Sequence, residues 1–397
     1  TLVAIAALAA FGAQAQSTVT ISGLADLGIN QTDFKGNKVT TSGAANGSAT
    51  TALIFAGTED LGGGTAAVFQ YEIDPNFADT SNRTKGTTAT GTTSNVTSSA
   101  GNGQSFVGLK GAYGQVRFGT PNSEALAANG DGNQGLGTAI GSGYRVTSFD
   151  AVRFQNSLRL DSPSFMGLTV SFLQSAKNNI QSNSLNNGQT GNLNNQTQGR
   201  DQVTELSASY ANGPLTIRGS NIKVTQWADV ALVGVGVNQF NTATWTNATG
   251  KEFKLNTLSA KYNVNDKLSA SYFYQGISSD SLDVAKATDG TASTTKYDRK
   301  TNGVAASYQA TPSIKLIASY QEAKNGANAT SSAASKANLV TKVTGLGVDY
   351  ALSKRTTAYF RTETDKDGIG ARDITGYTAA TGNTKYQATA FGIRHTF

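Results

Sequence analysis

Three arginines of this sequence have side chains that are well placed to act on ions. Arg117, in the segment QVRFGT, alternates with Val116 and Phe118, so it points to the opposite face of an extended strand from these two. In VRFQNSLRL, residues 152 to 160, the same alternation separates two sets of side chains. One face carries Val152, Phe154, Leu158 and Leu160, and the other carries Arg153, Arg159 and the following Asp161. Clustered fixed charges select ions by the sign of their field, so this pattern indicates electrostatic selection.

Catalysis and metal binding fit the sequence poorly. There are no cysteines, and the single histidine is His395, so thiolate sites, histidine clusters and a serine-histidine-aspartate triad all lack their residues. The stretch GDGNQG, residues 130 to 135, matches a glycine-rich nucleotide motif in spacing alone, because no strand precedes it and no helix pattern follows. We therefore expect a protein that is not an enzyme and has no catalytic residues, no metal site and no cofactor.

Composition narrows the class of protein. Of the 397 residues, 38% are hydrophobic and 15% are charged, which is too polar for a bundle of membrane helices. The formal charge of +6 is spread along the chain rather than gathered into a basic run, which argues against a nucleic-acid partner.

The first residues predict export. TLVAIAALAAFGAQAQS has an apolar stretch followed by Ala13-Gln14-Ala15, which is typical of a secretory signal peptide and its cleavage site. We expect residues 1–15 to be a signal peptide whose basic beginning is missing, and residues 16–397 to form one domain. The alternative is a short buried helix.

After this segment the pattern has a period of two, which favours β-strands. In TVTISGLADLGIN, apolar side chains such as Val19, Ile21 and Leu27 share one face, and polar ones mostly fill the other. Similar segments recur along the chain. They include TAAVFQYEID, LTVSFLQ, ELSASY, KLSASYFYQG, GVAASYQA, IKLIASYQ, TGLGVDYAL and TAYFRTET.

The connections alternate in length. Seven carry tight-turn residues: EDLGGG, KGAYG, DSPSFMG, YANGP, NVNDK, QATPS and ALSKR. Between them lie eight long polar stretches, at about 31–47, 75–103, 120–147, 176–202, 228–251, 278–298, 322–339 and 364–383. Fifteen connections join sixteen strands.

A transmembrane barrel explains this alternation. Loops of such length are unusual in a compact soluble domain, whereas outer-membrane barrels have short periplasmic turns and long extracellular loops. The ending AFGIRHTF agrees, because Phe391, Ile393, His395 and Phe397 share one face and Arg394 points the other way. In a membrane barrel, the aromatic rings of this strand would lie at the membrane interface, and Arg394 would lie in the aqueous lumen. We therefore predict an all-β, 16-stranded antiparallel transmembrane β-barrel.

Four segments resemble the sixteen-stranded trimeric general porins of Gram-negative outer membranes. They are GTEDLGGG, NSLRLDSPSFMGL, DYALSKRTTAYF and GIRHTF. The resemblance implies a homotrimer in contact with outer-membrane lipid and lipopolysaccharide. It also implies a third long loop folded into the lumen, passive diffusion of small hydrophilic solutes and ions, and a mild anion preference.

The same resemblance assigns a pore constriction. Arg117, Arg153 and Arg159, with Asp161 nearby, would form a basic wall. Glu124 and Asp131, in the third loop at about 120–147, would face these arginines across the channel and create a transverse field. The alternative is that these charges are solvated wall residues at other heights.

The sequence also departs from the family pattern. Members usually have Arg and Lys in the strand before GTEDLG and a Lys just after it, whereas this chain has Ala52, Ala56 and Ala66. Basic residues often found at the start of the third loop are also missing from GTP, 119 to 121. We expect a wider or less anion-selective pore. A substrate-specific channel with a saturable lumen site, a barrel enzyme and a surface adhesin remain as alternatives.

Overall fold

The computed structural model describes residues 18–34, 37–45, 47–75, 103–133, 136, 140–142, 153–154, 156–175, 202–225, 231–233, 244–246, 252–282, 295–326, 340–366 and 386–397. Within these ranges no helix is long and apolar enough to cross a membrane. The predicted signal peptide, residues 1–15, lies outside the described residues, so its assignment stays a prediction.

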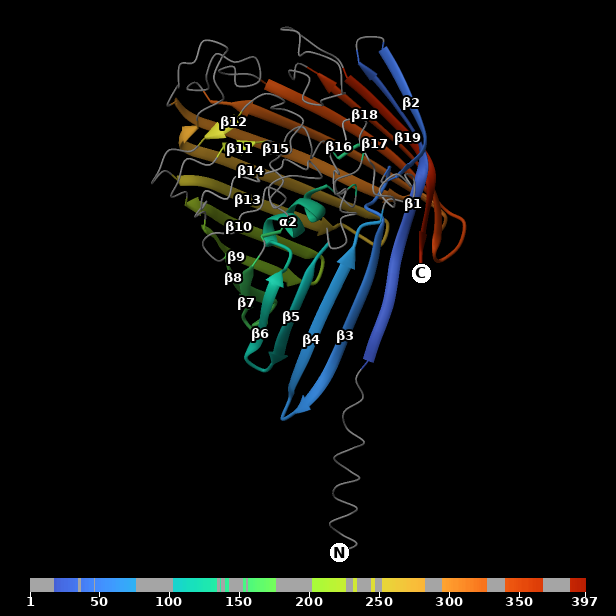
Figure 1. The fold of residues 1–397 in the computed structure, drawn as a ribbon. Coiled ribbons are helices and arrows are strands. Elements are labelled where there is room, and N and C mark those ends of the chain that lie inside the picture. Colours follow the sequence, from blue (N-terminus) through green and yellow to red (C-terminus); the bar gives the residue numbers. More distant parts are fainter. Residues whose placement is uncertain are drawn as a thin grey trace, which may run out of the picture.

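The strands form a closed antiparallel barrel (Figure 1). The first half contains β1 (Thr18–Phe34), β2 (Asn37–Ala45), β3 (Ala52–Gly62), β4 (Thr65–Ile73), β5 (Ser105–Gly111), β6 (Gly114–Thr120), β7 (Ser157–Asp161), β8 (Leu168–Ser175) and β9 (Gln202–Asn212). The second half contains β10 (Leu215–Thr225), β13 (Glu252–Asn263), β14 (Leu268–Leu282), β15 (Thr295–Gln309), β16 (Ile314–Asn325), β17 (Val340–Ala351), β18 (Thr356–Lys366) and β19 (Tyr386–Thr396). A separate small hairpin pairs β11 (Ala231–Val233) with β12 (Thr244–Thr246).

Sixteen strand positions close the ring. β2 and β3 occupy one position together, because β1 pairs with β3 along Thr18–Leu24 and with β2 along Leu27–Phe34. β1 also pairs with β19, and Gly23 and Phe397 exchange backbone hydrogen bonds of 3.0 and 3.1 Å where the ends of the sheet meet. Pairing of β1 with both β3 and β19 closes the ring, so the sheet has no free first or last strand there, as a lipid environment requires.

The outer face is apolar, as the period of two predicts. Val19 is 65% exposed, and Phe391, Ile393 and Phe397 of the last segment are 59%, 51% and 46% exposed, so the predicted outward set of that segment is confirmed. All seven predicted tight turns join consecutive strands of the barrel.

Some of the long connections predicted as loops contain strand residues. The expected loop at 31–47 is wrong over most of its length, because β1 continues to Phe34 and β2 begins at Asn37. β14 and β15 likewise extend into the expected loop at 278–298. Apolar alternation ends where the wall leaves the lipid, but backbone pairing continues in water with polar side chains on both faces.

One long connection turns inward. α2 (Glu124–Gly132) lies inside the ring of strands (Figure 1) and packs against β10, β13 and β14. The expectation of a third loop folded into the lumen is therefore confirmed.

Candidate functional site

A buried carboxylate anchors the start of α2. The Ser123 side chain caps the helix by accepting from the Leu126 amide at 3.1 Å. The amides of Glu124 and Ala125 donate to Oε1 of Glu205 on β9 at 3.0 and 3.1 Å, and Ser220 Oγ donates to the same oxygen at 2.6 Å. Glu205 is fully buried. A carboxylate at a helix N-terminus satisfies free amides and interacts favourably with the helix dipole.

Six charged side chains then form one continuous series of ion pairs. From the wall to the helix it runs Arg117, Asp161, Arg159, Glu124, Arg218 and Asp131. The successive N···O distances are 2.6, 2.8, 2.9, 2.6 and 2.5 Å. We call these six residues the ionic series. Its three positive and three negative charges balance.

The ionic series contains five of the six residues singled out in the sequence, but not in the expected arrangement. Glu124 was expected to face the arginines across the channel, and this is wrong because it contacts Arg159 directly. Asp131 binds Arg218, which sequence reasoning missed. The alternation of Arg218 with Ile217 and Gly219 on β10 could have predicted that Arg218 faces the lumen. Nothing in the sequence linked it to α2.

Arg153 lies outside the ionic series. Its Nη2 is 3.8 Å from Oε1 of Glu72, and its Nε donates to Oδ1 of Asn122 at 2.7 Å. Asp74, which follows β4, has a pKa raised to about 6, first because burial disfavours its charged form and then because Glu72 repels it. Arg153 therefore joins the base of the inward loop to the acidic end of β4.

The predicted alternation of side chains does not hold in the residues before β7. Phe154 was expected on the lipid face, but it is 1% exposed, so that expectation is wrong. Asn156 has φ of +50°, which breaks the alternation before β7 begins at Ser157. Val152 lies outside the described residues.

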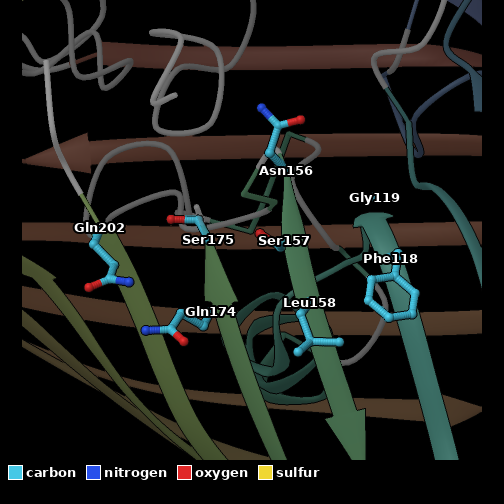
Figure 2. Close-up of a pocket in the computed structure, with 8 residues that line it drawn as sticks. All are labelled: Phe118, Gly119, Asn156, Ser157, Leu158, Gln174, Ser175 and Gln202. Atoms are coloured by element: carbon cyan, nitrogen blue, oxygen red, sulfur yellow. The ribbon is translucent and has the colours of Figure 1, made fainter. Parts of the chain in front are cut away.

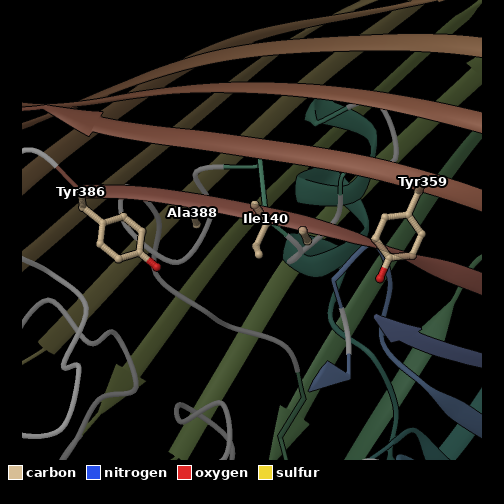
Figure 3. Packing of buried hydrophobic residues seen from close by; sticks show 5 residues of the cluster. Ile140, Tyr359, Tyr386 and Ala388 are labelled. Carbon is tan, nitrogen blue, oxygen red and sulfur yellow. The ribbon is translucent and has the colours of Figure 1, made fainter. Parts of the chain in front are cut away.

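The described part of the loop beyond α2 follows the inner wall. Ser271 Oγ donates to the Gly132 carbonyl at 2.7 Å, and Gln321 bonds to Asn133. Farther on, the Gly141 amide donates to Glu363 Oε2 at 2.8 Å. Ile140 packs against Tyr359, Tyr386 and Ala388 of β18 and β19 (Figure 3). The loop is thus fixed at both ends of an arc across the lumen.

A second inward segment lies between β2 and β3. We call residues 47–51 the strap. The fully buried Asp26 of β1 accepts from the amides of Ser48 and Ala49 at 2.8 and 2.6 Å, and from the hydroxyl of Tyr359. Arg394 Nη1 donates to Ser48 Oγ at 2.7 Å. The strap is therefore tied to the wall beside the loop end at Ile140.

The pocket in Figure 2 belongs to a different surface. It has a volume of about 450 Å³ and lies at the upper ends of β6 to β9. Phe118, Leu158 and Gln174 line it, and these side chains alternate with the inward Arg117, Arg159 and Leu173. The pocket therefore opens on the outer wall and not on the lumen.

Residues 1–370 match the family model described as Gram-negative porin. The chain belongs to this family. It is 32% identical over 185 residues to the major outer membrane protein P.IB of Neisseria lactamica, covering 44% of this chain and 50% of that protein. The chain thus spans about half the length of the relatives it matches. Family membership places it in the outer membrane of a Gram-negative bacterium.

Solved structures show the same porin fold. The anion-selective porin from Comamonas acidovorans has a TM-score of 0.67 at 21% identity, with 96% of this chain and 100% of that chain covered. In vitro folded OmpT of Vibrio cholerae in its trimer form has a TM-score of 0.56 at 12% identity, with 96% and 99% covered. These matches support the porin barrel fold.

Proposed function

We propose that this porin forms a water-filled channel for passive diffusion of small hydrophilic solutes and ions. The observation that carries the proposal is α2 inside a closed 16-stranded barrel, held there by Glu205 and the ionic series. A barrel of sixteen strands is wide enough for an aqueous lumen, and the inward loop narrows it.

The six predicted site residues contribute to the constriction in two ways. Arg117, Asp161, Arg159, Glu124 and Asp131 hold the loop and present both signs of charge to the lumen, whereas Arg153 fixes the base of the loop. Because the ionic series is balanced, selectivity is weak, and the overall charge of +6 gives a mild anion preference.

The assembly is a homotrimer in contact with outer-membrane lipid and lipopolysaccharide. The trimer form of the Vibrio cholerae neighbour supports three copies, and the broad apolar outer face supports the lipid contact. Residues 1–15 are a signal peptide that directs export.

Planar-bilayer recording of the purified protein tests the channel. We expect stepwise openings in groups of three and a reversal potential that shows a small anion bias in a salt gradient. Insertion without conductance would contradict the channel, and a clear cation preference would contradict the assigned selectivity. Conductance that saturates with one solute would instead favour a substrate-specific channel.

A further inference from the structure

The inward-facing side chains on the wall formed by β1, β3, β4 and β5 include six apolar ones that lie close together. We call them the apolar strip: Leu24, Ala52, Ile54, Ala56, Val68 and Phe106. Their direction follows from alternation with outward residues such as Ile21, Phe69 and Val107, which are 62%, 39% and 59% exposed.

The strip is continuous across the strands. Leu24 is the cross-strand partner of Ala52, and Ala52, Ile54 and Ala56 follow one another on the inner face of β3. Val68 lies diagonally from Ala56, because it is two residues from Gln70, the partner of Ala56. Phe106 lies diagonally from Val68 in the same way. Diagonal neighbours are within reach of each other's side chains.

On the wall of β13 and β14, two inward apolar side chains are covered. Leu255 and Phe273 are fully buried on β13 and β14, where α2 packs. In the apolar strip, every member except Val68 is only half-buried. β1 and β10 are the first and ninth of the sixteen strand positions, so the strip lies across the lumen from α2.

The strip lies near the level at which the inward loop begins. Ile54 is paired across the strands with Glu72, whose carboxylate contacts Arg153 at the base of the loop. Beside it, Gln104 accepts from the Asn122 amide at 2.9 Å, two residues before α2. A solute that passes α2 therefore passes the apolar strip.

The ionic series begins beside the strip, where the Arg117 guanidinium lies 5.3 Å from the centre of the Phe106 ring, and it ends on the opposite side of the passage with charges of both signs. Arg218 and Asp131 are the most exposed members of the ionic series, with 29% and 22% of their side chains accessible. A zwitterion can face such a pair with its carboxylate toward Arg218 and its ammonium toward Asp131. An apolar flank on the same solute would point toward the apolar strip.

We propose that this channel favours zwitterionic amino acids with an apolar side chain over polar ones of the same size. The proposal rests on the channel function above and names a substrate class for it. Weak apolar contact raises the concentration of the solute at the narrowest point without trapping it, which increases flux at low concentration.

Swelling of liposomes that contain the purified protein tests this preference. Leucine against asparagine and valine against threonine are pairs of nearly equal size and zero net charge. We expect the apolar member of each pair to enter about twofold faster, as a contact area of about 20 Å² would give. In the double variant I54T/V68T, the ratio should fall to about one.

Val107→Thr is the matched control, because it makes the same chemical change on the outward face of β5. It should leave both ratios unchanged. If liposomes with the wild-type protein conduct NaCl but the two amino acids of each pair enter equally fast, this proposal alone is overturned. The same holds if the I54T/V68T channel conducts NaCl and keeps the wild-type ratio of entry rates. Loss of all NaCl conductance in the wild type would overturn the channel function as well.

Discussion

Glu124 and Arg218 are 94 residues apart in the sequence, yet Oε1 of the first lies 2.6 Å from Nη1 of the second. The same guanidinium reaches Asp131 at the other end of α2. One wall side chain therefore binds both ends of the inward helix, while Arg159 contacts Glu124 from the neighbouring side. The acids of α2 and these wall arginines are therefore in direct contact and are not separated by the open channel.

Removing Arg218 should change ion selectivity. In Arg218→Gln, Glu124 keeps Arg159 but Asp131 loses its ion-pair partner among the described residues, so the lumen gains one uncompensated negative charge. We expect the reversal potential in a salt gradient to move toward cations.

Asp131→Asn is the opposite change and should move the reversal potential toward anions. The double variant R218Q/D131N restores the charge balance and should return close to the wild-type value. Shifts in the same direction for both single variants would contradict this account.

Removing the Glu205 charge should loosen the start of α2. Glu205→Gln keeps the size of the side chain, but it replaces a carboxylate that accepts from two helix amides and from Ser220. Hydrogen bonds to a charged group contribute about 1.5–3 kcal/mol each, so we expect a loss of that order in the free energy of unfolding. Thermal unfolding in detergent measures it.

Asp266→Asn, in an exposed periplasmic turn, is the control for Glu205→Gln and should unfold like the wild type. Single-channel recordings of Glu205→Gln should also show noisier current, because the helix is less firmly held. Unchanged stability and unchanged noise would show that Glu205 does not anchor the loop.

A side chain at Gly345 should displace the far end of the inward loop. A methyl group built on Gly345 of β17 would collide with the Gly141 carbonyl, whereas one on Gly219 of β10 would have its nearest neighbour at 4.0 Å. We expect Gly345→Ala to alter single-channel conductance and Gly219→Ala to leave it unchanged. If the two variants have equal conductance, the end of the loop at Gly141 does not contact Gly345.

Breaking the Asp26 contacts should release the strap. Asp26→Asn weakens the acceptor for the Ser48 and Ala49 amides and for Tyr359, whereas Tyr359→Phe removes one of these bonds only. We expect the free energy of unfolding to fall by about 1–3 kcal/mol in Asp26→Asn and by about 1 kcal/mol in Tyr359→Phe. Denaturation in detergent would compare them, and a larger loss in Tyr359→Phe would exclude Asp26 as the principal anchor.

Much of the barrel could be predicted from the sequence because each strand residue faces either lipid or water. The exposed Phe391, Ile393 and Phe397 follow this rule, and the seven short turns carry their own local signals. The rule failed at Phe154, where Asn156 changes the backbone direction, and beyond residue 31, where both faces of the wall meet water.

The sequence alone therefore determined the class of fold, the number of strands and the inward direction of Arg117 and Arg159. Only the tertiary structure decided that Arg218 joins them, that Glu205 receives the helix, and that Asp26 holds the strap. Periodicity is a local property of the backbone and can be read along the chain. Contacts across the lumen depend on where the closed ring brings distant strands together, and no local pattern contains that information.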